Sequence, residues 1–444
     1  MFKFRPAFFV RPGDSAGSRV SRRCRSARRP FRGILLFLGL LPLATPAVAG
    51  LSLAEAEQIA VDRDAVLGQL SQTSFAMRER AVASSQIEDP SLRIGAVNVP
   101  VDSLDLSAEN MTMLQVGVRQ AFPAGGTREL RREQMEYRAS AADAAAIDRR
   151  LQVQREVRRL WTELAFVARA GDLLDAEKDW VEQLRRSALA RYASGEGSQL
   201  EVLQAGLGEA MLREQRMDID RDRARQRAQL ARWLGEADAE RAGPFALPPD
   251  PGLESLAVLE KRLLDHPAQV DMERRIEAAN VAADLAKQRK RPGWMLDFSY
   301  GFRSGLDGTG ESRSDLVSAV VSVDLPLFAA NRQDREVAAA RADARSLHDM
   351  HVDHQRELNG ELVEAWQVAK QTSELEAFYA SELLPLADQS VQAALLGWRN
   401  DRAGIDEVVK ARRVALETRL KHLRLAADRA LAHFDIDYLA GEQP

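Results

Sequence analysis

The sequence has very little cysteine, since Cys24 is the only one among 444 residues. Cys24 lies upstream of an apolar run at residues 33–43, in a segment with the features of a cleaved leader. The chain beyond this leader therefore has no thiol, which excludes disulfides and cysteine-based metal sites from it. Long apolar runs are also missing. No segment approaches the roughly 18 consecutive apolar residues that indicate a membrane-spanning helix, so no helical span is expected.

Familiar catalytic signatures are absent beyond the leader. We find no Gly-rich phosphate loop, no H-E-x-x-H zinc motif and no G-x-S-x-G nucleophile motif there. The many carboxylates stand beside Arg and Lys on helical patterns, which is typical of solvated helix faces. We therefore expect a protein that is not an enzyme and that needs no cofactor.

Positive charge is concentrated at the start of the chain. The first 49 residues hold ten Lys and Arg against one acidic residue, Asp14. Of the 62 basic and 66 acidic residues in total, 52 and 65 then remain, so the rest of the chain has a net charge of −13. A nucleic-acid binder shows a basic face, and we therefore expect no nucleic-acid partner.

The N-terminal segment has the order of a secretory signal peptide. Its basic residues precede the apolar run GILLFLGLLPL at 33–43, which is followed by Ala47-Val48-Ala49 as an A-x-A cleavage site. The mature chain is expected to begin at Gly50 or Leu51. The basic part is long and Arg28-Arg29 resembles a twin-arginine signal, so a Sec leader, a twin-arginine leader and a start downstream of Met1 all stay open. The remaining alternative is a frayed N-terminus with a chance apolar run.

The rest of the chain contains an internal duplication. MTMLQVGVRQAFPAGG at 111–126 and DLVSAVVSVDLPLFAAN at 315–331 are both strand-like runs that end in an apolar-Pro pair and open into a long helical stretch. YASGEGSQLEVLQA at 192–205 aligns without gaps on WRNDRAGIDEVVKA at 398–411. The order of features is the same in both halves, which indicates two repeats of one supersecondary unit.

The predicted layout is a signal peptide, a first repeat, a linker and a second repeat. The boundaries are 1–49 for the signal peptide, 50–235 for the first repeat with a β-hairpin at 91–122 and long helices at 126–234, 236–256 for the linker, and 257–444 for the second repeat with a β-hairpin at 293–328 and long helices at 331–438. Ala-rich seams with charged flanks favour coiled-coil packing of these helices. We expect kinks at Gly171 and Pro385, and one helix ahead of each hairpin, at 51–69 and 259–285.

One strand has an unusually aromatic face. In WMLDFSYGFR, 294–303, alternation separates an apolar face from a largely polar one. The polar face carries Asp297, Ser299 and Arg303, which we expect to face water. The apolar face is expected to meet lipid, with Trp294 and Tyr300 in an interfacial aromatic girdle, and consists of Trp294, Leu296, Phe298, Tyr300 and Phe302.

Four strands of about ten residues suit a membrane-crossing β-sheet but cannot close a barrel alone. An open sheet edge is not tolerated in lipid, so other copies must supply the missing strands. Two copies would give eight strands and a barrel filled by side chains, whereas three would give twelve and hold water. We therefore expect a mostly α-helical chain that forms a trimeric transmembrane β-barrel, with four strands per chain, continuing into a long periplasmic α-helical barrel.

With these features the sequence resembles the TolC-like outer-membrane efflux family. The resemblance rests on the signal peptide, the duplicated layout, YASGEGSQLEVLQA at a helix junction and VVSVDLPLFAANRQDREVAAARA after a strand. It implies a homotrimer in the outer membrane, extending into the periplasm, with a periplasmic adaptor and an inner-membrane RND-type transporter as partners. AFPAGGTRE and PLFAANR are closer to the heavy-metal cation efflux branch, while multidrug efflux and type I secretion are alternatives within the same fold.

The resemblance also implies roles for residues at the two helix junctions. The family's tip motif consists of a Tyr, a Gly three residues later, and then a carboxylate that begins a D-V-L-x-A run. The second repeat departs from this motif at two positions. Asp401 stands where the motif has Gly, and Lys410 stands where it has a second carboxylate. The implied adaptor-docking residues are Tyr192, Gly195, Leu203 and Trp398. The implied pore gate consists of Glu201, Asp401, Asp406 and Glu407, and a ring of such carboxylates favours cations. The alternative is that these are ordinary solvated charges at helix ends.

The run HDMHVDH offers a weak metal candidate. His348, His351 and His354 are three residues apart on a predicted helix, but the outer two diverge by about 120° at 3.6 residues per turn. A solvated helical face is the simpler interpretation, and we expect no metal site.

Two interpretations that place the protein in another functional class stay open. One is a periplasmic coiled-coil scaffold or adaptor, which would have no use for an aromatic strand face, and the other is an exported metal-binding protein.

Overall fold

The computed structural model describes residues 50–400 and 402–441, and the predicted signal peptide and Cys24 lie outside this part. Long helices and four strands make up this part, so the prediction of a mostly helical chain with a small sheet is confirmed. The elements of the first repeat are α1 (Leu53–Arg63), α2 (Ala65–Ser85), β1 (Ser91–Val97), β2 (Met113–Phe122), α3 (Thr127–Ser194) and α4 (Gln199–Leu234).

The second repeat follows the same order. A short helix, α5 (Glu236–Arg241), occupies the start of the predicted linker, so this linker is not irregular throughout. The elements after it are α6 (Leu256–Leu263), α7 (Pro267–Gln288), β3 (Trp294–Phe302), β4 (Leu316–Val323), a 3₁₀ turn (Ala329–Asn331), α8 (Gln333–Phe378), a π turn (Tyr379–Leu383), α9 (Leu384–Arg399) and α10 (Ile405–Leu439).

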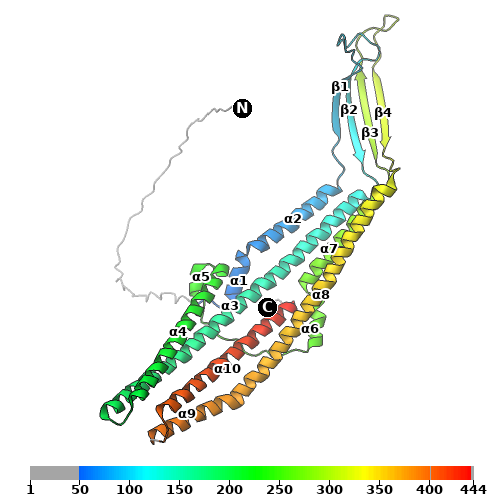
Figure 1. Ribbon diagram of the computed structural model, residues 1–444. Helices are drawn as coiled ribbons and strands as arrows, with labels where there is room; N and C mark the ends of the chain where they lie inside the picture. Colours follow the sequence, from blue (N-terminus) through cyan, green and yellow to red (C-terminus); the bar gives the residue numbers. More distant parts are fainter. Residues whose placement is uncertain (1–49, 401, 442–444) are drawn as a thin grey trace, which may run out of the picture. The chain divides into compact units, whose positions relative to one another are not determined.

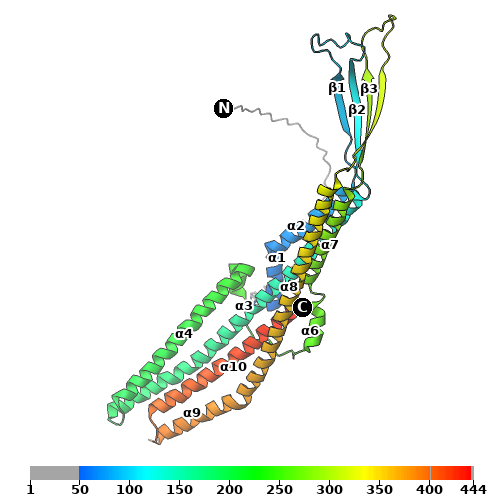
Figure 2. The same ribbon diagram turned by 45° about the vertical axis from the view of Figure 1, so that its right-hand side comes forward.

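The four strands form one antiparallel sheet in the order β1-β2-β3-β4. Its central pairing joins the repeats, since Val118 of β2 lies opposite Phe298 of β3. The rings of Phe122 and Trp294 stack at this pairing with centroids 4.0 Å apart. Within residues 50–441 the sheet lies at one end of the helices, and the α3–α4 and α9–α10 junctions lie at the other end (Figure 1, Figure 2).

The helix α3 is the longest element. It is a single helix of 68 residues that includes Gly171, where we expected a kink. At about 1.5 Å per residue it extends roughly 100 Å. Val153, Val157, Leu160 and Leu164 lie on one stripe and are almost fully buried, mainly against α1 and α4. Packing of such a stripe adds to the high helix propensity of the many Ala, Arg, Leu and Glu residues, and together they stabilise one helix over this length.

Each repeat begins with two helices where the sequence predicted one. In the first, Asp64 ends α1 and caps α2, because its carboxylate accepts the amide hydrogen of Leu67 at 2.8 Å. In the second, His266 caps α7 by accepting from Ala268 at 3.2 Å, and Pro267 stands at the first helical position. Asp64 at a helix cap and Pro267 at a first helical position both favour the start of a new helix. This explains why each predicted helix is divided into two.

The predicted kink at Pro385 has a counterpart in the backbone. A π turn, Tyr379–Leu383, immediately precedes this proline and separates α8 from α9. Proline cannot donate a backbone hydrogen bond to the preceding turn, and π turns are a common way of accommodating such a defect. The corresponding helix of the first repeat has no such defect.

Candidate functional site

The α3–α4 junction is a tight, fully bonded turn. Gly195 ends α3 in the left-handed conformation, with φ 79°, which a residue with a side chain rarely adopts. The amides of Glu196 and Gly197 both donate to the Arg191 carbonyl at 2.9 Å. Ser198 then caps α4 by accepting from the amide of Glu201 at 3.2 Å. The predicted positions Gly195 and Glu201 therefore hold the ends of two consecutive helices.

The α9–α10 junction is built differently. The amide of Arg402 donates to the Gly397 carbonyl at 2.8 Å, and α10 begins after Gly404, whose φ is an ordinary −76°. The predicted gate residue Asp401 lies outside the described residues. Asp406 and Glu407 are exposed in the first turn of α10, while the neighbours Ile405 and Val408 are buried. A carboxylate in this position is stabilised by the positive end of the helix dipole.

A small apolar core joins the two junctions. Its buried members are Leu184, Ala188, Ala205 and Ile405, and Trp398 packs against them. The guanidinium of Arg191 lies over the Trp398 ring, 5.8 Å from its centroid. The structure therefore brings residues of both repeats together here.

The predicted tip residues divide into two groups by exposure. Tyr192 and Leu203 are exposed, by 50% and 62%, and are free to meet a partner. Trp398 is mainly a packing residue instead. Glu201 is half-buried, and its Oε2 finds no hydrogen-bond partner among the residues that the structure describes.

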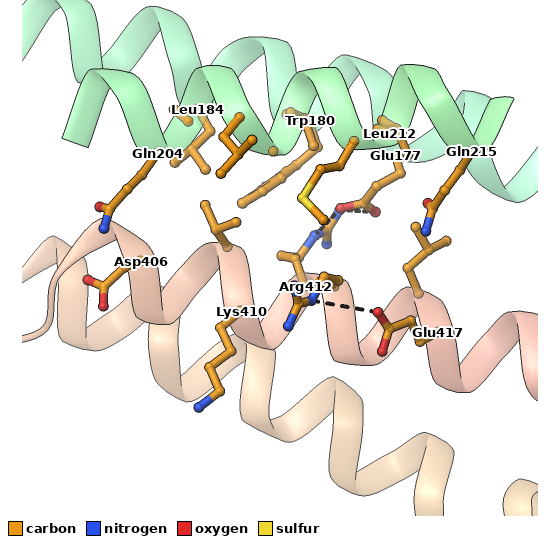
Figure 3. Close-up of a pocket in the computed structure, with 18 residues that line it drawn as sticks. Glu177, Trp180, Leu184, Gln204, Leu212, Gln215, Asp406, Lys410, Arg412 and Glu417 are labelled. Carbon is orange, nitrogen blue, oxygen red and sulfur yellow. Dashed lines mark hydrogen bonds and ion pairs between the residues drawn. The ribbon is translucent and has the colours of Figure 1, made fainter. Parts of the chain in front are cut away.

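A groove runs from these tips between α3, α4 and α10 (Figure 3). It has a volume of about 380 Å³, and its walls include Leu184, Met211 and Leu416 together with Asp406 at the tip end. The sequence analysis did not identify this groove. The part of α10 that lines it is more than 190 residues from those of α3 and α4, and no local pattern indicates such a contact.

An ion pair between α3 and α10 lies among the residues that line this groove. Arg412 of α10 binds Glu177 of α3 through two hydrogen bonds of 2.8 Å each, in the bidentate geometry that is strongest for arginine. The Arg412 guanidinium also lies over the Trp180 ring at 4.3 Å. Only 7% of the Glu177 side chain is exposed. This pair connects the α3–α4 hairpin to α10 of the α9–α10 hairpin near the helix junctions.

The sheet has one almost entirely apolar face. The predicted row in β3 lies on this face, and the register sets it beside apolar residues of the other three strands. Gln120 of β2, opposite Leu296, is the exception, because it is a polar residue on this face. Each of the five predicted side chains is between 37% and 52% exposed, and they are Trp294, Leu296, Phe298, Tyr300 and Phe302. A continuous exposed apolar face of this kind indicates contact with lipid or protein.

The opposite face differs in part from our expectation. Ser299 was expected to face water but is 5% exposed, because the Gln115 side chain covers it and donates to its hydroxyl at 2.7 Å. Arg303 binds the backbone carbonyls of Ser314 and Asn110 in the loops beyond the strands. Asp297 holds two arginines, as described below.

The histidine run lies within α8. Among the described residues, no group of three or more His, Cys, Asp or Glu side chains is arranged to hold a metal ion. His354 instead lies 3.3 Å from Glu357 one turn later on the same helix. In the part of the chain that the structure covers, no helix combines the length and the apolar character that a membrane crossing requires.

Comparison with known proteins shows similarity of fold. No family model and no curated protein matches the sequence. The outer membrane protein VceC from Vibrio cholerae has a TM-score of 0.74 at 16% identity, over 88% of this chain and 96% of that one. The CmeC outer membrane channel of Campylobacter jejuni has a TM-score of 0.73 at 13% identity, over 88% and 85%. For CusC, whose structures describe transmembrane channel formation, the values are 0.71 and 14%, over 88% and 92%.

Proposed function

We propose that the protein is a passive exit channel of the outer membrane, which passes substrate from the periplasm to the exterior within a tripartite efflux system. The observation that carries this proposal is the sheet at the end of the long helical hairpins. One of its faces is apolar and exposed, and the other is lined with polar groups. The similarity of fold to solved outer-membrane channels supports the same function.

The channel is proposed to be a homotrimer. In the single chain, β1 and β4 each pair on one side only and leave an edge open. An open edge would leave unpaired backbone groups in lipid. Three copies provide twelve strands, enough for a closed barrel with a water-filled lumen. The hairpins of the same three copies would surround the periplasmic part of the duct.

The helix junctions are proposed to form the gate and the adaptor contact. Exposed carboxylates at Asp406 and Glu407 stand at the start of α10, and three copies would repeat them around the threefold axis. Tyr192 and Leu203 are exposed on the neighbouring hairpin, where a periplasmic adaptor could bind. Opening would follow adaptor binding, and an inner-membrane transporter would supply the energy. Such a duct requires no chemical step and no cofactor.

Metal cations are the proposed substrate. This follows the resemblance of AFPAGGTRE and PLFAANR to the heavy-metal branch of the TolC-like family, and a carboxylate ring at the tip suits cations. CusC is among the solved structures with a similar fold. Drug-like compounds and secreted polypeptides are the competing substrates for the same architecture.

The test is single-channel conductance of the detergent-purified mature protein in a planar bilayer. We expect small cation-selective currents from the wild type and reduced cation selectivity from Glu407→Gln. Glu240→Gln is the matched control, because it removes an exposed carboxylate from α5, away from the tip. A protein that stays soluble without detergent and never inserts would contradict the channel and favour a periplasmic scaffold.

A further inference from the structure

The charged residues of the sheet are gathered at one place. The four strands contain three charged residues, namely Arg93 in β1, Arg119 in β2 and Asp297 in β3. Arg119 and Asp297 lie directly opposite each other in the register. Asp297 alternates with the aromatic row along β3 and therefore lies on the opposite face of the sheet. Arg93 and Arg119 lie on the same face as Asp297, as the register of β1, β2 and β3 shows.

The two arginines share a single carboxylate oxygen. Arg93 Nη1 donates to Oδ2 of Asp297 at 2.6 Å, and Arg119 Nε donates to the same oxygen at 3.0 Å. Arg93 reaches across β2 because its partner in the register is Gly117. A methyl group at Gly117 would approach the Ser299 Cβ to 2.7 Å, so the backbone there leaves no room for a side chain.

This cluster keeps an unmatched positive charge at the surface. Two guanidinium groups meet one carboxylate, so each chain has a net charge of one positive unit here. The Asp297 side chain is only 15% exposed, whereas those of Arg93 and Arg119 are 50% and 42% exposed. Arg119 uses Nε for Asp297, and its two terminal nitrogens bind no other described residue. Such groups suit the oxygens of carboxylates and phosphates.

We propose that Arg93, Arg119 and Asp297 form an anion-binding level in the lumen of the barrel. The proposal rests on the proposed trimeric channel, in which three copies would place six arginines and three aspartates around the lumen. This level has the opposite sign to the carboxylates at the tip. It attracts anions that carry carboxylate or phosphate groups, while the tip carboxylates set the preference for cations at the other end of the duct.

The test is block of the single-channel current by tripolyphosphate added on the side of the sheet. The wild type is expected to be blocked. Arg93→Gln combined with Arg119→Gln should raise the half-blocking concentration about tenfold or more, as loss of a charge-assisted hydrogen bond implies. Asp297→Asn should lower it, because it removes the only negative charge of the cluster. Arg93→Lys combined with Arg119→Lys keeps the charge and should keep most of the block.

Three results would overturn the proposal. The first is block that the double glutamine variant leaves unchanged. The second is a weaker block in Asp297→Asn, which would mean that the arginines act only when the carboxylate positions them. The third is a difference between variants that persists in 1 M salt, where the screening length is about 3 Å. Absence of any current in the wild type is a different result, since it contradicts the channel itself.

Discussion

The two repeats share one order of elements but differ in how firmly each helical hairpin is built. In the first, α3 is continuous and buries twenty of its 68 residues. In the second, a π turn and Pro385 divide the corresponding helix, and α9 buries only Ala387 and Val391. The two predicted repeats therefore have the same order of elements, while the long helix is continuous in the first and divided in the second.

The junctions repeat this difference. The first turns on a left-handed glycine, Gly195, with two amides bonded to one carbonyl. In the second, Gly404 precedes α10 with an ordinary φ of −76° and gives the helix no side-chain cap. A helix end without a cap and a short, poorly buried α9 both lower the free energy of local opening. We therefore expect the second helical hairpin to open locally more readily than the first.

The ion pair of Arg412 and Glu177 is a buried connection between the repeats, and breaking it should have the largest effect of these variants. Arg412→Met leaves the Glu177 carboxylate buried without its partner, which should lower the free energy of unfolding by about 3–5 kcal/mol. Denaturant unfolding followed by circular dichroism measures this loss. Arg413→Met is the matched control. Arg413 lies 3.6 Å from Glu417, both side chains are about half exposed, and the loss should stay below about 1 kcal/mol.

A smaller effect is expected at the glycine turn of the first hairpin. Gly195→Ala forces a side chain into the left-handed region, which should cost about 1–2 kcal/mol. Space is not the cause, because a methyl group there would meet nothing within 4 Å. Gly206→Ala lies inside α4 with equally open surroundings, and it should stabilise the protein by about 0.5–1 kcal/mol. The two variants should shift the thermal midpoint in opposite directions, and equal shifts would contradict this account of the turn.

The last effect concerns pH and the helix caps of the two repeats, and it should not exceed the effect at the glycine turn. Burial lowers the pKa of His266, whose Nε2 lies 3.0 Å from the Tyr438 carbonyl and whose Nδ1 accepts from Ala268. The folded state therefore takes up a proton on this ring at a lower pH than the unfolded chain, whose histidine pKa is about 6.5. Stability should fall as the pH drops from 7 towards 5, by at most about 1.4 kcal/mol per pH unit from this group.

His266→Asn separates this contribution from the others. Asparagine can still cap the helix but does not titrate, so the variant should lose less stability between pH 7 and 5 than the wild type. Asp64 provides the comparison in the first repeat. Burial would raise its pKa, but hydrogen bonds from Arg149 and the Leu67 amide outweigh this effect and lower the pKa. Its contribution is lost only below about pH 4. An equal slope in wild type and His266→Asn would exclude His266 as the source.

The sequence predicted the features that depend on local pattern. Alternation identified the aromatic row of β3, and helical periodicity identified the long helices. Two local signals were present but overlooked. Asp64 before an apolar run and Pro267 after His266 are both typical helix starts. They explain why each expected helix is in fact two.

Contacts between distant residues could not be predicted in the same way. Glu177 and Arg412 are 235 positions apart, and Arg93 and Asp297 are 204 apart. Each of these residues looks like an ordinary surface charge when its own segment is considered. Only the packing of α10 against α3 and the pairing of three strands bring them together. The roles assigned to the tip carboxylates remain predictions.

The central pairing of the sheet has a consequence for how the protein forms. Phe122 of β2 can contact its partner, Trp294 of β3, only after the intervening helices α3 to α7 have been synthesised. Pairings so distant in sequence close late, because a long loop must be ordered first. Until then the first two strands expose their apolar side chains and an open edge, which is the state most prone to aggregation. The order of synthesis thus leaves β1 and β2 without β3 until the second half of the chain has been made.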